Sequence, residues 1–229
     1  MTGRKTENRP PRRGGRPPQE QAGELRERIL AVATELFLTQ GYGATSIEAI
    51  AKQAGISKRT FYHRFTDKAD LFGAVVHHLV TKLRPAQSAP LLTGGSLKEI
   101  LQRLAKAILR ASLAPEALAL HRLIVGESLR FPELAMIVDR EGSRREAMGH
   151  IADLLMHQAH LSDRARALLA AEQFLQMVVS IPQRRALGLG PKMAATEYEP
   201  WAQEAVDSFL YGCIAHRPLD LSVPTNGTN

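Results

Sequence analysis

This sequence lacks the features that mark disulfide-bonded, membrane-spanning and β-rich proteins. Its 229 residues hold a single cysteine, Cys213, which excludes an intrachain disulfide framework and fits a cytoplasmic location. The longest apolar runs are a few residues, too short for a transmembrane helix. The first residues are basic and contain no apolar stretch, so we expect no secretory signal. Strand-like alternation of apolar and polar residues is also missing, so we predict an all-α fold.

Acidic residues are scarce at the amino-terminal end. Residues 1–19 hold six basic residues against one acidic residue, a net charge of +5 out of +7 for the whole chain. Four prolines and three glycines occupy much of the rest, and such a segment buries too little apolar surface to offset the entropy of ordering. We therefore predict a disordered basic arm that suits a polyanion, with Arg13 and Arg16 lying in a DNA minor groove. A solubilising tail explains the same composition equally well.

The next segment carries the local signals of a first and a second helix. Apolar residues at helical spacing run from Leu25 to Phe37, and Gly41 lies just beyond the end of this helix. Thr45 or Ser46 is the N-cap of the second helix, which we place from Ser46 to about residue 54. Glu48 follows Thr45 by three residues, a spacing that predicts a capping box.

A third, short helix follows almost at once. Gly55 ends the second helix, and Ser57 caps a helix over residues 58–65 that buries Phe61 and Phe65. Two short helices joined by a tight turn have the proportions of a helix-turn-helix. The exposed cations and hydroxyls at the start of the third helix suit contacts to phosphates and base edges in a DNA major groove.

The remainder of the chain is a series of longer helices. Asp67 caps a fourth helix that Pro85 ends, and residues 85–95 are predicted to form a linker. Ser96, Pro115 and Ser162 mark the starts of three of these helices. With the apolar periodicity, they predict one helix that begins at residue 96 and further helices over residues 115–131, 133–161 (interrupted near Gly142), 162–187 and 200–215.

Two stretches carry a family resemblance. The pattern Thr45-Ser46-Ile47-x-x-Ile50-Ala51-x-x-Ala54-Gly55-Ile56-Ser57-Lys58-x-Thr60-Phe61-Tyr62-x-x-Phe65-x-x-Lys68-x-x-Leu71 resembles the DNA-binding domain of the TetR family of bacterial transcriptional regulators. Residues 114–134, together with Ala171-Glu172-Gln173-Phe174-Leu175, are similar to the AefR-like subclass. The resemblance implies a homodimer that binds palindromic double-stranded DNA, is released by a small-molecule effector and uses no cofactor. The implied organisation is a disordered arm (1–19), a helix-turn-helix domain (20–66), a ligand-binding and dimerisation domain (67–216) and a disordered tail (217–229).

The resemblance also implies roles for individual residues. Lys58 and Arg59 are the candidates for reading bases, because a basic side chain pairs well with guanine. The expected DNA-binding set is Thr45, Ser46, Ser57, Lys58, Arg59, Thr60, Tyr62, His63, Arg64, Lys68, Arg13 and Arg16.

The C-terminal helices supply candidate dimer and ligand residues. The last two long helices are apolar over more than one face, which predicts a partner for the excess surface. The expected dimer set is Leu168, Phe174, Leu175, Val178, Trp201, Val206, Phe209 and Leu210. Polar groups that could line a ligand cavity among residues 96–187 are His121, Arg122, Glu127, Gln173 and Gln176.

Other function classes fit less well. His150, Asp153, His157 and His160 share a helix face and could form a metal site, but the stripe reads as solvated, so no metal is predicted. No phosphate-binding glycine loop or nucleophile elbow is present, which argues against an enzyme. The arginine-rich arm leaves open an architectural or activating DNA-binding protein.

Overall fold

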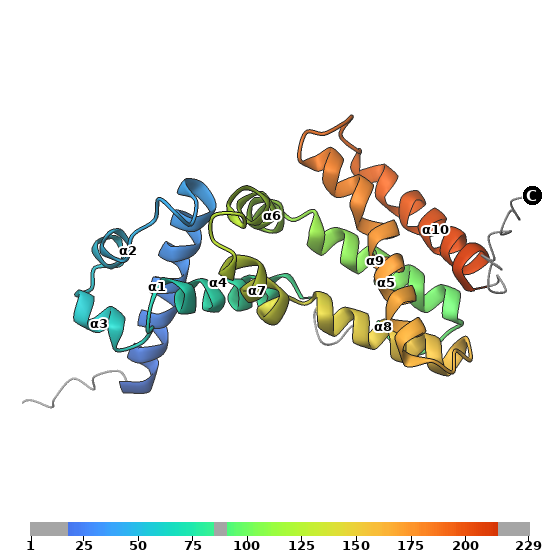
Figure 1. Ribbon diagram of the computed structural model, residues 1–229, viewed down its shortest axis with the longest axis horizontal. Coiled ribbons are helices and arrows are strands. Elements are labelled where there is room, and N and C mark those ends of the chain that lie inside the picture. Colours follow the sequence, from blue (N-terminus) through green and yellow to red (C-terminus); the bar gives the residue numbers. More distant parts are fainter. Residues whose placement is uncertain (1–17, 85–90, 215–229) are drawn as a thin grey trace, which may run out of the picture.

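The computed structural model describes residues 18–84 and 91–214, and these residues fold into helices without any strand. This confirms the all-α prediction. A helical head lies at one end of an elongated molecule and a helical bundle at the other, with α6 and α7 between them (Figure 1). The helices are α1 (Pro18–Gln40), α2 (Ile47–Gln53), α3 (Lys58–Tyr62), α4 (Lys68–Leu83), α5 (Leu97–Ser112), α6 (Pro115–Glu127), α7 (Glu133–Glu141), α8 (Arg144–Gln158), α9 (Arg164–Ala186) and α10 (Tyr198–Ser208).

The helix starts in the head follow their caps, with small shifts from prediction. Ser46, not Thr45, is the N-cap of α2, and its side chain accepts a hydrogen bond from the Ala49 amide. The expected capping box is absent because, with Ser46 as the N-cap, the third helical residue is Ala49 and not Glu48; Glu48 pairs with Lys58. Helix α3 ends at Tyr62, shorter than expected, and α1 begins at Pro18, so residues 18 and 19 are helical rather than part of the arm.

One hydrophobic core joins the head to α6 and α7. It includes Phe37 of α1, Phe61 of α3 and Phe72 of α4, all fully buried. Leu123 of α6 and Leu134 of α7 belong to the same cluster. The packing therefore groups α4, α6 and α7 with the DNA-binding head, while the domain boundary at residues 66 and 67 stays a prediction.

A second core holds α5, α8, α9 and α10 together, and side chains of the predicted dimer set take part in it. Side chains that we expected at a dimer interface are buried inside the protomer: Phe174, Val178, Val206 and Phe209 are fully buried and Leu175 is nearly so. Leu168, Trp201 and Leu210 pack half-buried against the same cluster. The physical reason is that α9 and α10 each contribute a face to a core shared with α5 and α8. Leu169, Ile181, Leu189 and Tyr211 are among the large apolar side chains that remain exposed on this part of the molecule.

Pro182 near the end of α9 leaves one backbone carbonyl without its helical donor, and a side chain of α10 supplies the hydrogen bond. Proline has no amide hydrogen, so the carbonyl four residues earlier, that of Val178, loses its helical donor. The indole Nε1 of Trp201 donates to this oxygen across 2.9 Å. Trp201 therefore links α9 to α10 within one protomer through this hydrogen bond.

The remaining boundaries differ slightly from prediction. Asp163, not Ser162, caps α9 and accepts from the Ala165 amide. Gly142 separates α7 from α8 as anticipated, in a position where a Cβ would overlap the Val138 carbonyl. The expected linker is described only from residue 91, and most of residues 1–19 and the tail 217–229 lie outside the described residues.

Candidate DNA interface and its link to the C-terminal half

Exposed polar side chains gather at the start of α3. Ser57 caps this helix, and its Oγ accepts from the Thr60 amide at 3.1 Å and lies 2.9 Å from the Thr60 hydroxyl. Buried Phe61 fixes the opposite face, so Arg59, Tyr62 and His63 point toward solvent. The sequence-predicted groove-facing residues of α3 are therefore brought together on one exposed surface.

An ion pair joins α3 to the start of α2. Lys58 Nζ contacts Glu48 Oε1, and both side chains are more than half exposed. This pair raises the pKa of Lys58 and lowers that of Glu48. Ser46, the N-cap of α2, lies two residues before Glu48 in the chain. Of the two candidate base-reading residues, Lys58 must leave Glu48 to reach DNA, whereas Arg59 has no ion-pair partner among the described residues.

A shallow hollow lies beside α3. It is lined by Arg59, Thr60, His63 and Arg64 and has a volume of about 320 Å³. Arg64 Nη1 donates to the Ala22 carbonyl at 3.4 Å, which ties α3 to the start of α1. Two other predicted DNA contacts, Arg13 and Arg16, lie outside the described residues.

Two predicted phosphate-binding side chains instead face the interior. Thr45 is 2% exposed, and its hydroxyl donates to the carbonyls of Leu36 and Gly41. Lys68 Nζ donates to the carbonyls of Tyr42 at 2.9 Å and Thr45 at 3.1 Å. Both groups are used to hold the turn between α1 and α2, so neither is placed as a free phosphate ligand in this structure.

Tyr42 anchors that turn in an aromatic cluster. Its ring lies 5.6 Å from that of Phe37, 5.4 Å from that of Phe72 and 5.2 Å from that of Phe131. Burial raises the pKa of the Tyr42 phenol to about 12. Lys68 Nζ sits 4.3 Å from the centre of the Tyr42 ring, and burial lowers the pKa of this lysine.

Glu127, expected as a ligand-cavity residue, binds the same turn from α6. One carboxylate oxygen accepts from the Tyr42 amide at 2.8 Å and the other from the Gly43 amide at 2.6 Å. Gly41 has a φ of +90°, and a Cβ at this position would overlap Glu127 Oε1. A Cβ on Gly43 would lie 3.0 Å from the Phe131 ring. The two glycines therefore make room for the approach of α6 as well as shaping the turn.

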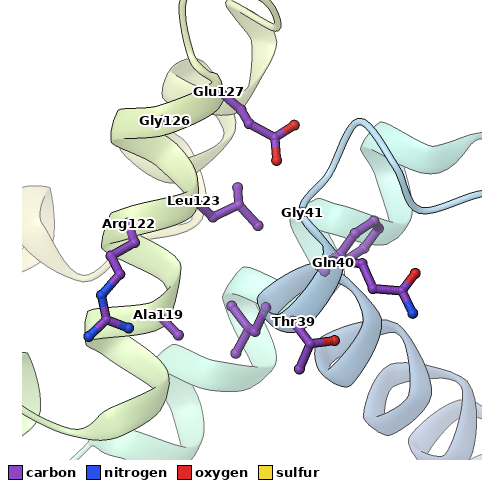
Figure 2. Close-up of a pocket in the computed structure, with 10 residues that line it drawn as sticks. Thr39, Gln40, Gly41, Ala119, Arg122, Leu123, Gly126 and Glu127 are labelled. Atoms are coloured by element: carbon purple, nitrogen blue, oxygen red, sulfur yellow. The ribbon is translucent and has the colours of Figure 1, made fainter.

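A pocket of about 320 Å³ lies beside this contact, between the end of α1 and α6. Figure 2 shows Leu123 directed into the gap and Glu127 directed from α6 toward the turn at Gly41, while Arg122 points away from it. The lining is Phe37, Leu38, Thr39, Gln40, Gly41, Ala119, Arg122, Leu123, Gly126 and Glu127. Two of the five predicted ligand residues, Arg122 and Glu127, thus line one pocket.

The other predicted ligand residues are placed elsewhere. Gln173 and Gln176 lie on the exposed face of α9, so they do not line an internal cavity, and Gln176 accepts from Ser180 at 2.8 Å. His121 is half-buried on α6 outside the pocket lining.

Two residues of the predicted histidine stripe contact other side chains, and His160 lies beyond the end of α8. His150 lies 3.7 Å from Glu146, and Asp153 pairs with Arg164. Within residues 18–84 and 91–214, no group of three or more His, Cys, Asp or Glu side chains is placed to hold a metal ion. Over the same residues, every helix is too short or too polar to cross a bilayer.

The fold and the exposed surface of α3 define a helix-turn-helix DNA-binding regulator. A family model of the tetR family of bacterial regulatory proteins matches residues 29–75, and a model of the AefR-like transcriptional repressor C-terminal domain matches residues 99–212. The chain belongs to the TetR family of bacterial transcriptional regulators, which are DNA-binding regulators and not enzymes.

Curated relatives match mainly in the head. The HTH-type transcriptional regulator AcrR of Shigella flexneri is 44% identical over 57 residues, which are 25% of this chain and 26% of the relative. The HTH-type transcriptional activator FasR of Mycolicibacterium smegmatis is 39% identical over 83 residues, 35% of this chain and 36% of the relative. The matched segment thus spans about a quarter to a third of these relatives.

Solved structures match over most of the chain. A TetR-family transcriptional regulator from Mesorhizobium loti is 29% identical, with a TM-score of 0.68 over 83% of this chain and 97% of that one. The flavonoid-responsive regulator FrrA is 30% identical, with a TM-score of 0.64 over 82% of this chain and 96% of that one. The shared fold therefore includes the C-terminal helices as well as the head.

Proposed function

We propose that this chain is a homodimeric repressor in the cytoplasm that binds an inverted-repeat operator and releases it when a small-molecule effector binds. The observation that carries the proposal is the exposed cationic and hydroxylic surface of α3, held on a buried Phe61. Repression is favoured by the match to the AefR-like repressor domain.

In the proposed complex α3 enters the major groove. Arg59 is the principal base-reading residue because it is exposed and has no ion-pair partner within the described residues. Lys58 joins it after exchanging Glu48 for a DNA acceptor. Ser46, Ser57, Thr60, Tyr62, His63 and Arg64 supply phosphate and flanking contacts. The proposed contacts omit the side chains of Thr45 and Lys68, which hold the turn inside the head.

The proposed dimer forms through the outer faces of α9 and α10. Leu169 is 56% and Ile181 45% exposed on α9, and Tyr211, in the helical turn that follows α10, is 72% exposed. A second copy would cover these side chains and set two α3 helices about 34 Å apart, the spacing of successive major grooves. Replacing Leu169 with Glu is expected to give monomers in light scattering, whereas Leu129→Glu, at an exposed apolar position near α6, leaves the dimer intact.

The effector is proposed to bind the C-terminal half and to favour a dimer whose heads are wrongly spaced for DNA. The pocket between α1 and α6 is one candidate site, because its lining includes Arg122 and Glu127 of α6 as well as residues 37–41 of the head. FrrA responds to flavonoids by its name, so flavonoids are the first effectors to test. Effector control is refuted if operator affinity is unchanged by every compound that binds the protein.

The central test is selection of bound sequences from random DNA, followed by fluorescence anisotropy on the selected duplex. The expected result is an inverted repeat bound at least about a thousandfold more tightly than random DNA. Arg59→Ala should lose about tenfold or more of that preference. Arg110→Ala, at an exposed arginine of α5, is the matched control and should bind like the unaltered chain. A chain with no preference for any sequence refutes the proposal.

A second candidate is an activating or architectural protein that uses the arginine-rich arm. The name of FasR, an activator, favours activation, and the basic arm of residues 1–19 favours general DNA binding. Reporter transcription separates activation from repression. An architectural protein would bind random and selected DNA alike.

A further inference from the structure

We infer that Glu127 fixes the orientation of α2 and α3 relative to α6, by binding the backbone of the turn that leads into α2. This inference rests on the proposed function and adds a mechanism of regulation to it. It assigns Glu127 as a positioning residue that acts on DNA through the backbone of residues 42 and 43.

The contact is specific in its geometry. Each of the two carboxylate oxygens takes one amide, that of Tyr42 at 2.8 Å and that of Gly43 at 2.6 Å. Hydrogen bonds to a charged acceptor are stronger than those between neutral groups. Glu127 lies in the last turn of α6, and its partners are about 85 residues earlier in the chain, so this one side chain joins two distant segments.

The turn is held from its other side by the head itself. Lys68 of α4 binds the carbonyls of Tyr42 and Thr45, and the hydroxyl of Thr45 binds the carbonyls of Leu36 and Gly41. These bonds, together with the aromatic cluster around Tyr42, maintain the fold of the turn. Glu127 is therefore the contact whose loss releases the turn from α6, while the head stays folded and stays packed on α6 through the shared core.

The position of the contact relates it to DNA binding. The bound amides lie three and four residues before Ser46, which caps α2, and α2 is paired to α3 through Glu48 and Lys58. The neighbouring pocket between α1 and α6 gives a small molecule direct access to the same contact. Opening of the gap would withdraw Glu127 from the turn and let the two heads of a dimer leave their groove spacing.

The test uses the full chain with Glu127→Gln and, as the matched control, Glu116→Gln. Glu116 lies in the first turn of the same helix, where it pairs with Lys82 of α4 and not with the turn. Amide hydrogen exchange should be at least about tenfold faster at Tyr42 and Gly43 in Glu127→Gln than in the unaltered chain. The control should leave both rates unchanged.

DNA binding supplies the second readout. On the selected duplex, Glu127→Gln should weaken binding about tenfold, because the heads are no longer held at the required spacing. The dependence of affinity on salt should be unchanged, because no phosphate contact is lost. Equal affinity of Glu127→Gln and the unaltered chain, or exchange that is equally slow in both, overturns the inference. Failure of the unaltered chain to prefer any duplex instead refutes the proposed function.

Discussion

The hydrogen bond from Trp201 to Val178 should depend on Pro182. In the unaltered chain the indole is the donor that replaces the amide missing at Pro182. Trp201→Phe keeps an aromatic ring but removes this donor, leaving a carbonyl without a partner between two helices. Leaving a buried acceptor unsatisfied costs about 1–3 kcal/mol. Loss of part of the ring adds to that cost, so the single variant alone does not isolate the bond.

A double-mutant cycle with Pro182→Ala does isolate it. Alanine at 182 restores an amide that can reach the Val178 carbonyl within α9, so the indole is no longer needed there. We expect Trp201→Phe to cost about 1–2 kcal/mol less in the Pro182→Ala background than in the unaltered chain. The assay is urea unfolding followed by far-ultraviolet circular dichroism at one protein concentration, since the chain has a single tryptophan and would lose its fluorescence. Equal costs in the two backgrounds would refute the reasoning.

Three further predictions concern the head and the arm. Gly41→Ala should lower the free energy of unfolding by at least about 1–2 kcal/mol, because its φ of +90° is unfavourable for alanine and the new Cβ meets Glu127; a urea midpoint that does not move contradicts this. The raised pKa of Tyr42 means that its phenol contributes stability that is present below pH 10 and is lost as pH rises through about 12. Absorbance at 295 nm should show a late-titrating phenol that Tyr42→Phe abolishes. Deleting residues 1–16 should weaken DNA binding and flatten its salt dependence, with the slope reduced by up to about 5 in an anisotropy titration; an unchanged slope leaves the arm without a phosphate role.

Local chemistry explains why the head could be predicted from the sequence. A serine before a helix is recognisable because its hydroxyl accepts from an amide three residues on, as Ser46 and Ser57 do here. Gly41 and Gly55 both adopt positive φ, the conformation that glycine permits at a helix end. Each of these signals involves a few neighbouring residues, so no knowledge of the tertiary structure is needed.

The roles of Thr45, Lys68 and Glu127 depend on contacts that local patterns do not contain. Thr45 precedes the N-cap and looks exposed in the sequence, but α1 covers it. Glu127 was expected to face a ligand, and nothing in the sequence indicates that it also binds a turn 84 residues away. A signal was present in Gly43, which lacks a positive φ and whose missing side chain is explained by contact with Phe131. A glycine that a turn does not require indicates a close approach by another element.

The surplus of apolar residues in α9 and α10 shows a second limit on what can be predicted from the sequence. Helical spacing tells which residues share a face, but it does not tell which of two apolar faces the protomer covers itself. Phe174 and Phe209 meet at a ring distance of 5.1 Å inside the core, so the face that looked most suitable for a partner is already used. The surface left for a second copy carries fewer apolar side chains, among them Leu169 and Ile181.

The two cores and the Glu127 contact together limit how a signal could pass from the C-terminal half to DNA. The core of α5, α8, α9 and α10 is separate from the core of the head, and α6 and α7 pack on the head through Leu123 and Leu134. These apolar contacts tolerate small changes in angle, because dispersion attraction has little directionality. The two amide bonds to Glu127 do not, because each requires its own distance and angle. A small movement of α6 would therefore break the polar contact first while the apolar packing persists, and the head would turn without unfolding.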